Sequence, residues 1–196
     1  MISGESNSLP RLFLIRHGDT DWTDSHRHTG LTDLPLNADG EKHAATLQAR
    51  LKNESFAEVF TSPLIRAQRT CELAGFGVRA ERDSDLMEWN YGTFEGLTTT
   101  QIQVTHPGWT IWNATPDGGE SAEQVGARVD RVIERAGAVG GDVALFAHGH
   151  VLRVLGARWV GMEPRGGRML GLSTGSVSVL GYEREARVIN LWNRTE

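Results

Sequence analysis

Three short motifs in this sequence bring histidine and arginine together: Arg-His-Gly at 16–18, Ser-Pro-Leu-Ile-Arg at 62–66 and His-Gly-His at 148–150. Each follows a short apolar run. The guanidinium group of arginine matches the oxygens of a phosphate with paired hydrogen bonds. A neutral imidazole nitrogen can attack phosphorus and so divide a difficult phosphoryl transfer into two easier steps. These residue types therefore predict a phosphate site served by a histidine nucleophile.

Each of these features has a plain structural alternative when it is taken singly. A histidine at the end of a strand is more often structural than catalytic, and an arginine in the first turn of a helix usually contacts solvent or an acidic partner. Gly18 and Gly149, beside two of the histidines, serve either as turn residues or as points where backbone and ligand come close. The prediction therefore depends on all three motifs reaching one place.

The elements around the motifs explain how they would meet. Nearly continuous apolar runs at 11–15, 58–61 and 142–147 are typical of strands that are buried on both faces. Helical patterns alternate with them, over 37–53, 64–74, from 121 onward and 150–160. This alternation predicts an α/β fold with a largely parallel central sheet. Because ligands of such sheets bind outside the carboxyl ends of the strands, the three motifs are expected at one edge.

Local signals set the expected ends of two helices. Ser62 is a candidate N-cap with Pro63 at the first helical position, and Gly75 suits the end of that helix. Ser121 and Gln124 have the spacing of a capping box, which predicts the start of a later helix.

The end of the chain and the segment before residue 120 follow other patterns. Residues 176–182 and 187–192, separated by a charged turn, predict a C-terminal antiparallel hairpin, so the sheet is expected to be mixed. The less regular segment 97–119 carries Trp109 and Trp112 and is expected to form a short lid insertion. These two tryptophans either pack the lid down or line the pocket for an organic substrate.

One domain is expected over residues 11–196, after a polar, disordered lead-in at 1–10. The lead-in has neither the positive region nor the apolar core of a signal peptide. No apolar run approaches the roughly 20 residues that span a bilayer. The single cysteine, Cys71, can form no internal disulfide, which suits a reducing compartment. A cytoplasmic protein is therefore expected.

The charge balance narrows the class of partner. A net charge of −5 and a pI near 5.8 argue against binding to nucleic acid or to an anionic membrane. An anion site must then be a local concentration of arginines within an acidic protein. The expected partner is a small phosphorylated substrate, without a cofactor or a metal, and the terminal hairpin offers an edge for a homodimer.

The motifs LIRHGDT, SPLIRAQRT, EWNYGTFEG and AHGHVLR resemble, in this order, those of the histidine phosphatase superfamily, in its phosphoglycerate-mutase-like branch. The resemblance extends from about Arg11 to Trp192 and implies a three-layer αβα sandwich. Within the branch, the stretches RHTGLTDLPL, EWNYGTFEGLTTTQI and PDGGES resemble a subgroup of small phosphatases. That subgroup includes broad acid phosphatases and sedoheptulose-bisphosphatase-like enzymes.

The resemblance implies a role for each matching residue of the phosphate site. His17 would be the nucleophile that carries a phosphohistidine intermediate. Arg16, Arg66 and His148 would hold the phosphate and the charge that develops on its oxygens. The Gly149 backbone would lie against the same group.

The resemblance also implies that Glu88 protonates the leaving alkoxide. An acid must keep its proton at the working pH, and packing among Met87, Trp89 and Tyr91 would favour the neutral carboxyl by desolvation. The alternative for Glu88 is a salt bridge to an arginine on the rim. Asp85 is the second candidate for the acid.

Residues just after the first motif depart from the family pattern. Thr23 stands where many members have an asparagine that helps to hold phosphate, and its hydroxyl can donate one hydrogen bond. Arg27, His28 and Thr29 are candidates for the rim that contacts the rest of the substrate, or they form a polar loop without a ligand role. His150 stands where mutases often have asparagine.

Hydrolysis and transfer to a second acceptor are both known in this branch. The bisphosphoglycerate-dependent mutases have a longer insertion with paired arginines between the positions of Glu88 and His148. The arginines in this interval are Arg128, Arg131 and Arg135, on a predicted helix. A phosphomonoesterase is therefore favoured, with phosphoglycerate mutase-type transfer as the alternative.

Two further function classes stay open at this point. The His-x-His pairs at 26–28 and 148–150 could ligate zinc in a metal-dependent hydrolase, although Arg16 would repel the cation. A non-enzymatic binder of phosphorylated ligands could use the same pocket. Such a binder would be expected to lack the nucleophile or the acid.

Overall fold

The computed structural model describes residues 9–196, so residues 1–8 of the predicted disordered lead-in lie outside the described part. A six-stranded mixed sheet forms the centre, in the order β3-β2-β4-β1-β5-β6. The strands are β1 (Leu12–Arg16), β2 (Glu58–Thr61), β3 (Glu81–Arg82), β4 (Val143–Ala147), β5 (Val177–Glu183) and β6 (Ala186–Arg194). The first four are parallel, and β5 and β6 form the antiparallel hairpin that the sequence predicts.

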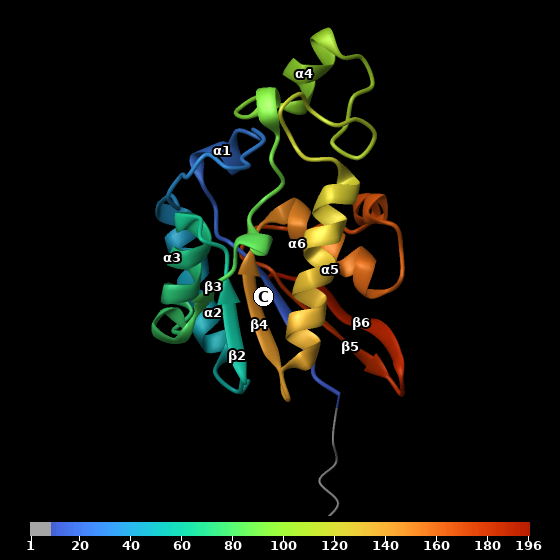
Figure 1. The fold of residues 1–196 in the computed structure, drawn as a ribbon. Helices are drawn as coiled ribbons and strands as arrows, with labels where there is room; N and C mark the ends of the chain where they lie inside the picture. The colour runs from blue at the N-terminus through green and yellow to red at the C-terminus, as the bar shows by residue number, and fades with distance from the viewer. Residues whose placement is uncertain (1–8) are drawn as a thin grey trace, which may run out of the picture.

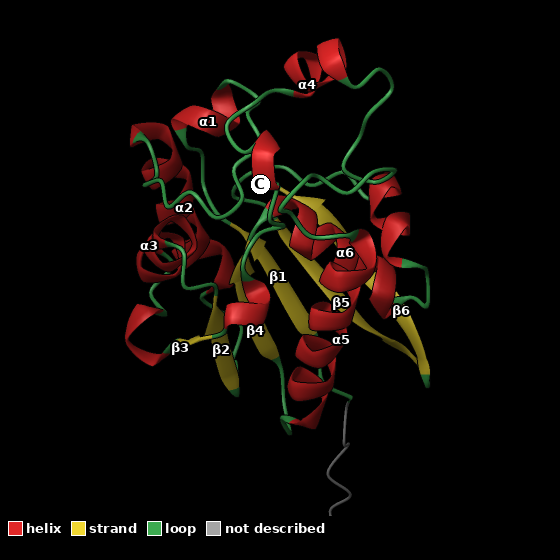
Figure 2. Cartoon of the chain, turned by 45° about the horizontal axis from the view of Figure 1, so that its top comes forward, coloured by secondary structure: helices red, strands yellow, loops and turns green. Residues whose placement is uncertain are grey.

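Helices cover both faces of this sheet, which confirms the three-layer αβα sandwich (Figures 1 and 2). One face carries α2 (Ala38–Leu51) and α3 (Ile65–Leu73), and the other carries α5 (Ala122–Ala138) and α6 (Gly149–Trp159). Along β1, Leu12 and Leu14 face the α5 side while Phe13 and Ile15 face the α2 side. Both faces are buried, and this explains the uninterrupted apolar run.

Most of the predicted ends of helices and strands agree with the structure to within one or two residues. Ser121 caps α5 in a reciprocal capping box with Gln124, and Gly75, with a positive φ of 90°, follows the end of α3. The predicted cap of α3 is wrong. That helix begins at Ile65, whose N–H donates to the carboxylate of Asp33 at 2.7 Å. The Ser62 hydroxyl instead contacts a side chain from another strand end and accepts from the Leu64 N–H.

The structure adds short elements that the sequence pattern did not indicate. These are α1 (Asp21–Asp24), β3, α4 (Thr99–Thr105) and four 3-10 helices. The helix α4 lies within the segment 97–119, which rises above the carboxyl ends of the strands (Figure 1). None of the helices in residues 9–196 is long and apolar enough to cross a membrane.

Two glycines allow the loop after β1 to lie directly against the start of α2. A Cβ atom on Gly18 would come within 2.4 Å of the Gly40 carbonyl oxygen. A Cβ on Gly40 would come within 2.1 Å of the Asp19 carbonyl oxygen. Both contacts are with backbone, which cannot swing away as a side chain can. This approach fixes the loop that carries His17.

We therefore predict that Gly40→Ala lowers the free energy of unfolding by about 1–3 kcal/mol, because the added methyl group overpacks a backbone contact. The measurement is urea denaturation. Gly137→Ala is the matched control within α5, where an added Cβ meets no atom within 4 Å. The control should be neutral or stabilising by up to about 1 kcal/mol. Equal stability of the two variants would contradict the close approach.

Candidate active site

The three motifs meet at one edge of the sheet, as predicted, because β1, β2 and β4 are parallel and end there. A cavity of about 100 Å³ opens at this edge. Eight of the ten predicted site residues line it: Arg16, His17, Thr23, Arg27, His28, Thr29, Glu88 and Gly149. The other lining residues are Tyr91, His150, Arg153 and Leu172.

His17 is positioned by one hydrogen bond of its backbone and one of its ring. Its backbone N–H donates to the Ala147 carbonyl of β4, and its ring Nδ1 lies 2.7 Å from the Gly18 carbonyl oxygen. A carbonyl oxygen can only accept, so Nδ1 carries the proton and Nε2 keeps its lone pair. Burial, followed by the charges of Arg66 and Arg16, lowers the pKa of His17 well below its usual value. The ring is therefore neutral and nucleophilic at Nε2.

Arg16 presents donors without a protein partner. Its Nη1 donates to the Leu172 carbonyl, whereas its buried Nε has no acceptor among residues 9–196. An unpaired donor of this kind is costly unless a ligand completes it. Gly149 makes room for this guanidinium, since a Cβ there would come within 3.2 Å of Arg16 Cζ. The absent side chain thus lets Arg16 lie against the start of α6.

Arg66 and His148 lie behind the cavity instead of lining it. The Arg66 Nε donates to His148 Nδ1 at 3.1 Å, and its Nη groups donate to the carbonyls of Gly30, Thr32 and Thr29. His148 Nε2 in turn lies 2.7 Å from the Ser62 hydroxyl, and its ring centroid is 5.1 Å from that of His17. Both side chains are fully buried. The structure thus brings them to the site, but with their polar atoms already paired.

Glu88 reaches the cavity with its carboxylate bound to backbone. Its Oε1 accepts from the N–H groups of Trp89 and Val151, and its Oε2 accepts from that of His150, each at 2.9 Å. Two of these donors belong to the first turn of α6, where the helix dipole also favours an anion. Trp89 and Tyr91, two of its predicted neighbours, are both buried. Three backbone N–H donors thus surround a carboxyl for which the sequence suggested an apolar setting.

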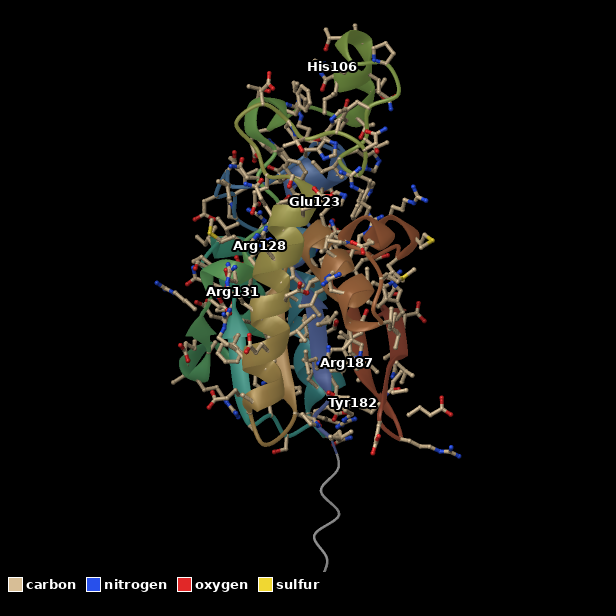
Figure 3. The ribbon with its side chains drawn as sticks, turned by 45° about the vertical axis from the view of Figure 1, so that its right-hand side comes forward. His106, Glu123, Arg128, Arg131, Tyr182 and Arg187 are labelled. Carbon is tan, nitrogen blue, oxygen red and sulfur yellow. The ribbon has the colours of Figure 1, made fainter. Side chains whose placement is uncertain are left out.

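An ion pair between Arg128 of α5 and Glu120 holds the segment that carries Glu88. Arg128 donates to Glu120 and to the carbonyls of Asp85 and Met87 at 2.6–3.1 Å. Figure 3 shows Arg128 and Arg131 on the same side of α5. The arginines between Glu88 and His148 therefore serve this segment and do not enter the cavity.

Asp85, the second candidate for the acid, does not line the cavity. It forms ion pairs with Arg131 and Arg135. Burial acts to raise its pKa, but the hydrogen bonds and charges of these two arginines outweigh it and lower the pKa of Asp85. Asp85 is thus committed to a structural role.

The predicted rim residues all lie at the cavity, but they differ in what they can still bind. The Thr23 hydroxyl donates to the Thr20 carbonyl and accepts from the Thr20 N–H in the capping box of α1, so its proton is already used. Arg27 is exposed and makes one long hydrogen bond, to the Gly96 carbonyl at 3.3 Å. The Thr29 hydroxyl donates to the Arg27 carbonyl. Arg27 is the rim residue with free donors.

His28 and His150 form an aromatic wall together with Tyr91. The rings of His28 and Tyr91 lie 4.8 Å apart, and the Tyr91 hydroxyl contacts His150 Nδ1. Burial, reinforced by the charges of Glu88 and Glu95, raises the pKa of Tyr91, so the phenol keeps its proton. Burial also lowers the pKa of His150 well below its usual value, so its ring is neutral beside the phenol.

The segment 97–119 backs this wall. Trp109 packs edge-on against His28, with centroids 5.4 Å apart, and Trp112 packs against His150 at 5.3 Å. Neither tryptophan lines the cavity. The two tryptophans therefore pack against the wall and do not line the pocket. His106, at the end of α4, lies far above the sheet (Figure 3).

The two His-x-His pairs do not converge on a common point. His26 is exposed, with a positive φ of 55°, whereas His28 faces the cavity. His148 contacts Ser62 and Arg66, whereas His150 contacts Tyr91. No group of three or more potential metal ligands occurs within residues 9–196. The zinc-site interpretation therefore has no ligand geometry behind it.

Tyr91, His150, Arg153 and Leu172 were not assigned to the site from the sequence. Arg153 follows Gly149 by four residues on α6, so the two share a helix face, and this spacing was the one available signal. Leu172 belongs to the loop before β5, and no local pattern marks it.

The buried histidines predict that stability falls in acid. Burial lowers the pKa of His28 from 6.5 to about 4. Between these pH values the histidine is protonated in the unfolded chain but neutral in the folded protein. The neutral ring therefore contributes fully to the free energy of unfolding above pH 6.5, and this contribution is lost as the pH falls toward 4. The loss amounts to about 3 kcal/mol. His28→Gln should flatten the dependence of the unfolding free energy on pH in this window, measured by denaturation at a series of pH values. An unchanged slope would contradict the neutral, buried ring.

Comparison with known proteins agrees with this geometry. Residues 12–195 match the model of the histidine phosphatase superfamily (branch 1). An acid phosphatase of Mycobacterium tuberculosis is 37% identical over 90% of this chain and 89% of its own length. A sedoheptulose 1,7-bisphosphatase of Saccharomyces cerevisiae is 34% identical over 78% and 68%, and a probable phosphoglycerate mutase of Cronobacter sakazakii is 30% identical over 93% and 89%. A solved structure from M. tuberculosis superposes with a TM-score of 0.90 at 34% identity, covering 95% of this chain and 99% of that one. The chain belongs to the histidine phosphatase superfamily.

Proposed function

We propose that this protein is a phosphomonoesterase that hydrolyses a small phosphorylated metabolite, such as a sugar phosphate, through a phosphohistidine on His17. One observation carries the proposal. His17 is held with its Nδ1 proton on the Gly18 carbonyl, and it lines a cavity together with Arg16, whose buried Nε lacks an acceptor. A phosphate group supplies both the electrophile for the imidazole and the acceptor for the guanidinium.

In the first step, the Nε2 lone pair of His17 attacks phosphorus and the bond to the ester oxygen breaks. Arg16 donates to the phosphate oxygens, on which negative charge accumulates. Arg66 and His148 act from behind, since their polar atoms already hold each other, Ser62 and the loop at 29–32. Arg66 keeps positive charge near the phosphate, and the two side chains together fix the surroundings of His17.

Glu88 is the proposed acid for the departing oxygen. In the structure its carboxylate is stabilised by three N–H groups. As the acid of this step, Glu88 passes its proton to the ester oxygen as it leaves. Glu88 then takes a proton from water, the water oxygen attacks phosphorus, and the bond to His17 breaks to release phosphate.

Phosphoryl transfer of the phosphoglycerate mutase type is the second candidate. The relative that is named a probable phosphoglycerate mutase favours it. Against it, the arginines between Glu88 and His148 bind Asp83, Asp85 and Glu120 instead of the cavity. With 3-phosphoglycerate as substrate, release of phosphate supports hydrolysis, and isomerisation without release would overturn it.

We also propose that the protein works in the cytoplasm and forms a homodimer through β6. Cys71 is buried and burial raises the pKa of its thiol to about 12, so it stays an inert core residue. The strand β6 is at the edge of the sheet. A monomer in sedimentation, or recovery of the protein outside the cytoplasm on cell fractionation, would reject the respective proposal.

His17→Ala should abolish turnover of p-nitrophenyl phosphate while leaving the circular dichroism spectrum unchanged, because no other group in the cavity offers an uncharged nucleophilic nitrogen in the same place. Wild-type turnover should be unaffected by EDTA and should have a bell-shaped dependence on pH, because the nucleophile must be unprotonated and the acid protonated. Loss of activity with EDTA would indicate a metal, and absence of wild-type turnover would indicate a binder. Retention of activity in His17→Ala would refute the mechanism.

Glu88→Gln should lower kcat for glycerol 3-phosphate by about 10²–10⁴-fold, the usual contribution of a general acid. The loss should be much smaller for p-nitrophenyl phosphate, because p-nitrophenolate leaves without a proton. Asp85→Asn, with the same change of charge three residues away, is the matched control and should retain kcat. Equal losses for the two substrates would argue against Glu88 as the acid.

A further inference from the structure

A single contact sets the direction of the Arg16 guanidinium in the cavity. Its Nη1 donates to the Leu172 carbonyl, and this is the one hydrogen bond of the Arg16 side chain within residues 9–196. The guanidinium is planar, so a bond at Nη1 also restricts the direction of the buried Nε–H, which has no acceptor in this part of the chain. Whatever fixes the Leu172 carbonyl therefore also fixes a donor that the proposed phosphate needs.

The Leu172 carbonyl belongs to the same peptide group as the N–H of Ser173. This peptide is trans, and its C=O and N–H therefore point in opposite directions. The N–H donates to Oδ1 of Asn193 at 2.6 Å. The peptide is thus held at both ends, by Asn193 on one side and by Arg16 on the other. Each of the two bonds polarises the peptide in the sense that strengthens the other bond.

The same two residues at the end of β6 hold the peptide's neighbours. The side-chain amide of Asn193 also donates to the Ser173 hydroxyl at 3.3 Å. The indole N–H of Trp192 donates to the Gly171 carbonyl at 2.6 Å. The Trp192 ring itself lies against α6, since a Cβ on Gly156 would come within 2.7 Å of it. The loop before β5 is therefore attached to β6 on both sides of the peptide that Arg16 contacts.

The backbone of β6 is distorted at the point from which these side chains reach the loop. The register between β5 and β6 shifts here, so that Trp192 and Asn193 both lie opposite Ser178. Such a β-bulge bends a strand and changes the direction of its side chains. Asn193 has a positive φ of 58°, which asparagine tolerates better than most residues. Its N–H donates to the buried Ser178 hydroxyl at 2.9 Å, which ties the bulge to the sheet.

We propose that Asn193 is a positioning residue for Arg16, which it orients for phosphate through the Leu172–Ser173 peptide. This inference rests on the proposed phosphatase function and adds to it a residue that does not line the cavity. Without the Asn193 side chain, the peptide loses the acceptor of its N–H, and its carbonyl no longer has a fixed direction. Phosphate must then order Arg16 as it binds, and that ordering weakens the affinity.

Asn193→Gly tests the side chain alone, because glycine adopts the positive φ of the bulge without strain. The dissociation constant of inorganic phosphate, measured by calorimetric titration, should rise about 10-fold, and kcat/KM for p-nitrophenyl phosphate should fall by a similar factor. A merely structural role would reduce the folded fraction, and with it kcat, but would leave the dissociation constant unchanged. An unchanged constant would therefore overturn the proposal.

Two further variants separate the hydrogen bond from other effects of the substitution. Asn193→Asp keeps the acceptor for the Ser173 N–H and should hold the dissociation constant within about 3-fold of wild type, since one charged or neutral acceptor serves the same donor. A rise as large as that of Asn193→Gly would contradict the role of this bond. Asn190→Gly is the matched control, an exposed asparagine of the same strand, and should leave the constant unchanged.

The Nε–H resonance of Arg16 in a ¹H–¹⁵N spectrum observes the guanidinium directly, and its loss in Arg16→Lys assigns it. In the wild type, inorganic phosphate should shift this resonance, because Nε gains an acceptor. In Asn193→Gly the resonance should differ from wild type before phosphate is added, and the shift should be half complete at about 10-fold more phosphate. Identical resonances in the two free proteins, or no shift with phosphate in the wild type, would overturn the proposal.

These binding measurements need no turnover, so the two proposals can fail separately. Failure of the phosphatase function would show as absent hydrolysis of p-nitrophenyl phosphate, with the difference in phosphate affinity between wild type and Asn193→Gly intact. Failure of the Asn193 inference would show as hydrolysis with equal phosphate affinity in the two proteins.

Discussion

The site depends on positive charge that is buried at the sheet edge without a carboxylate to cancel it. Arg66 is the clearest case, since its donors end on the carbonyls of Gly30 and Thr32 and on the ring of His148. Carbonyl oxygens satisfy the geometry of a guanidinium while leaving its full charge in a poorly solvated place. Two consequences follow at the same edge. The neighbouring histidines are kept neutral, and the cavity becomes a place where an anion is stabilised.

Some residues of the sequence motifs do not line the cavity but form hydrogen bonds that fix the segments of those that do. The Thr70 hydroxyl accepts from the Gly18 N–H and donates to the Arg66 carbonyl, so it joins the loop after β1 to the first turn of α3. The Glu95 carboxylate accepts from the N–H groups of Gly30 and Thr32, which fixes the carbonyls that Arg66 needs. The spacing within SPLIRAQRT and EWNYGTFEG therefore reflects a hydrogen-bond network as much as it reflects catalysis.

The start of α6 is shared by the proposed acid and the substrate. Glu88 occupies the N–H groups of His150 and Val151, and Gly149 brings Arg16 beside the same turn. Anions placed at one helix N-terminus compete for its dipole and repel each other. The proposed acid and the phosphate are therefore placed close together at this turn. The packing of Trp112 under Arg153 connects the segment 97–119 to the same turn.

The sequence alone determined five of the six strands, most helix ends and the gathering of His17, Arg16, Glu88 and Gly149. Burial pattern and turn chemistry act between neighbours, and parallel strands end at one edge. Only the tertiary structure decided which polar atoms remain free. The Ser62 hydroxyl is engaged by His148, 86 residues away, and so does not cap α3. Long-range partners of this kind have no local signature. A helical period fixes which residues share a face but not what that face meets. Packing against η4 (Pro164–Met169) and Trp112 therefore decided the direction of the α6 face that presents Arg153.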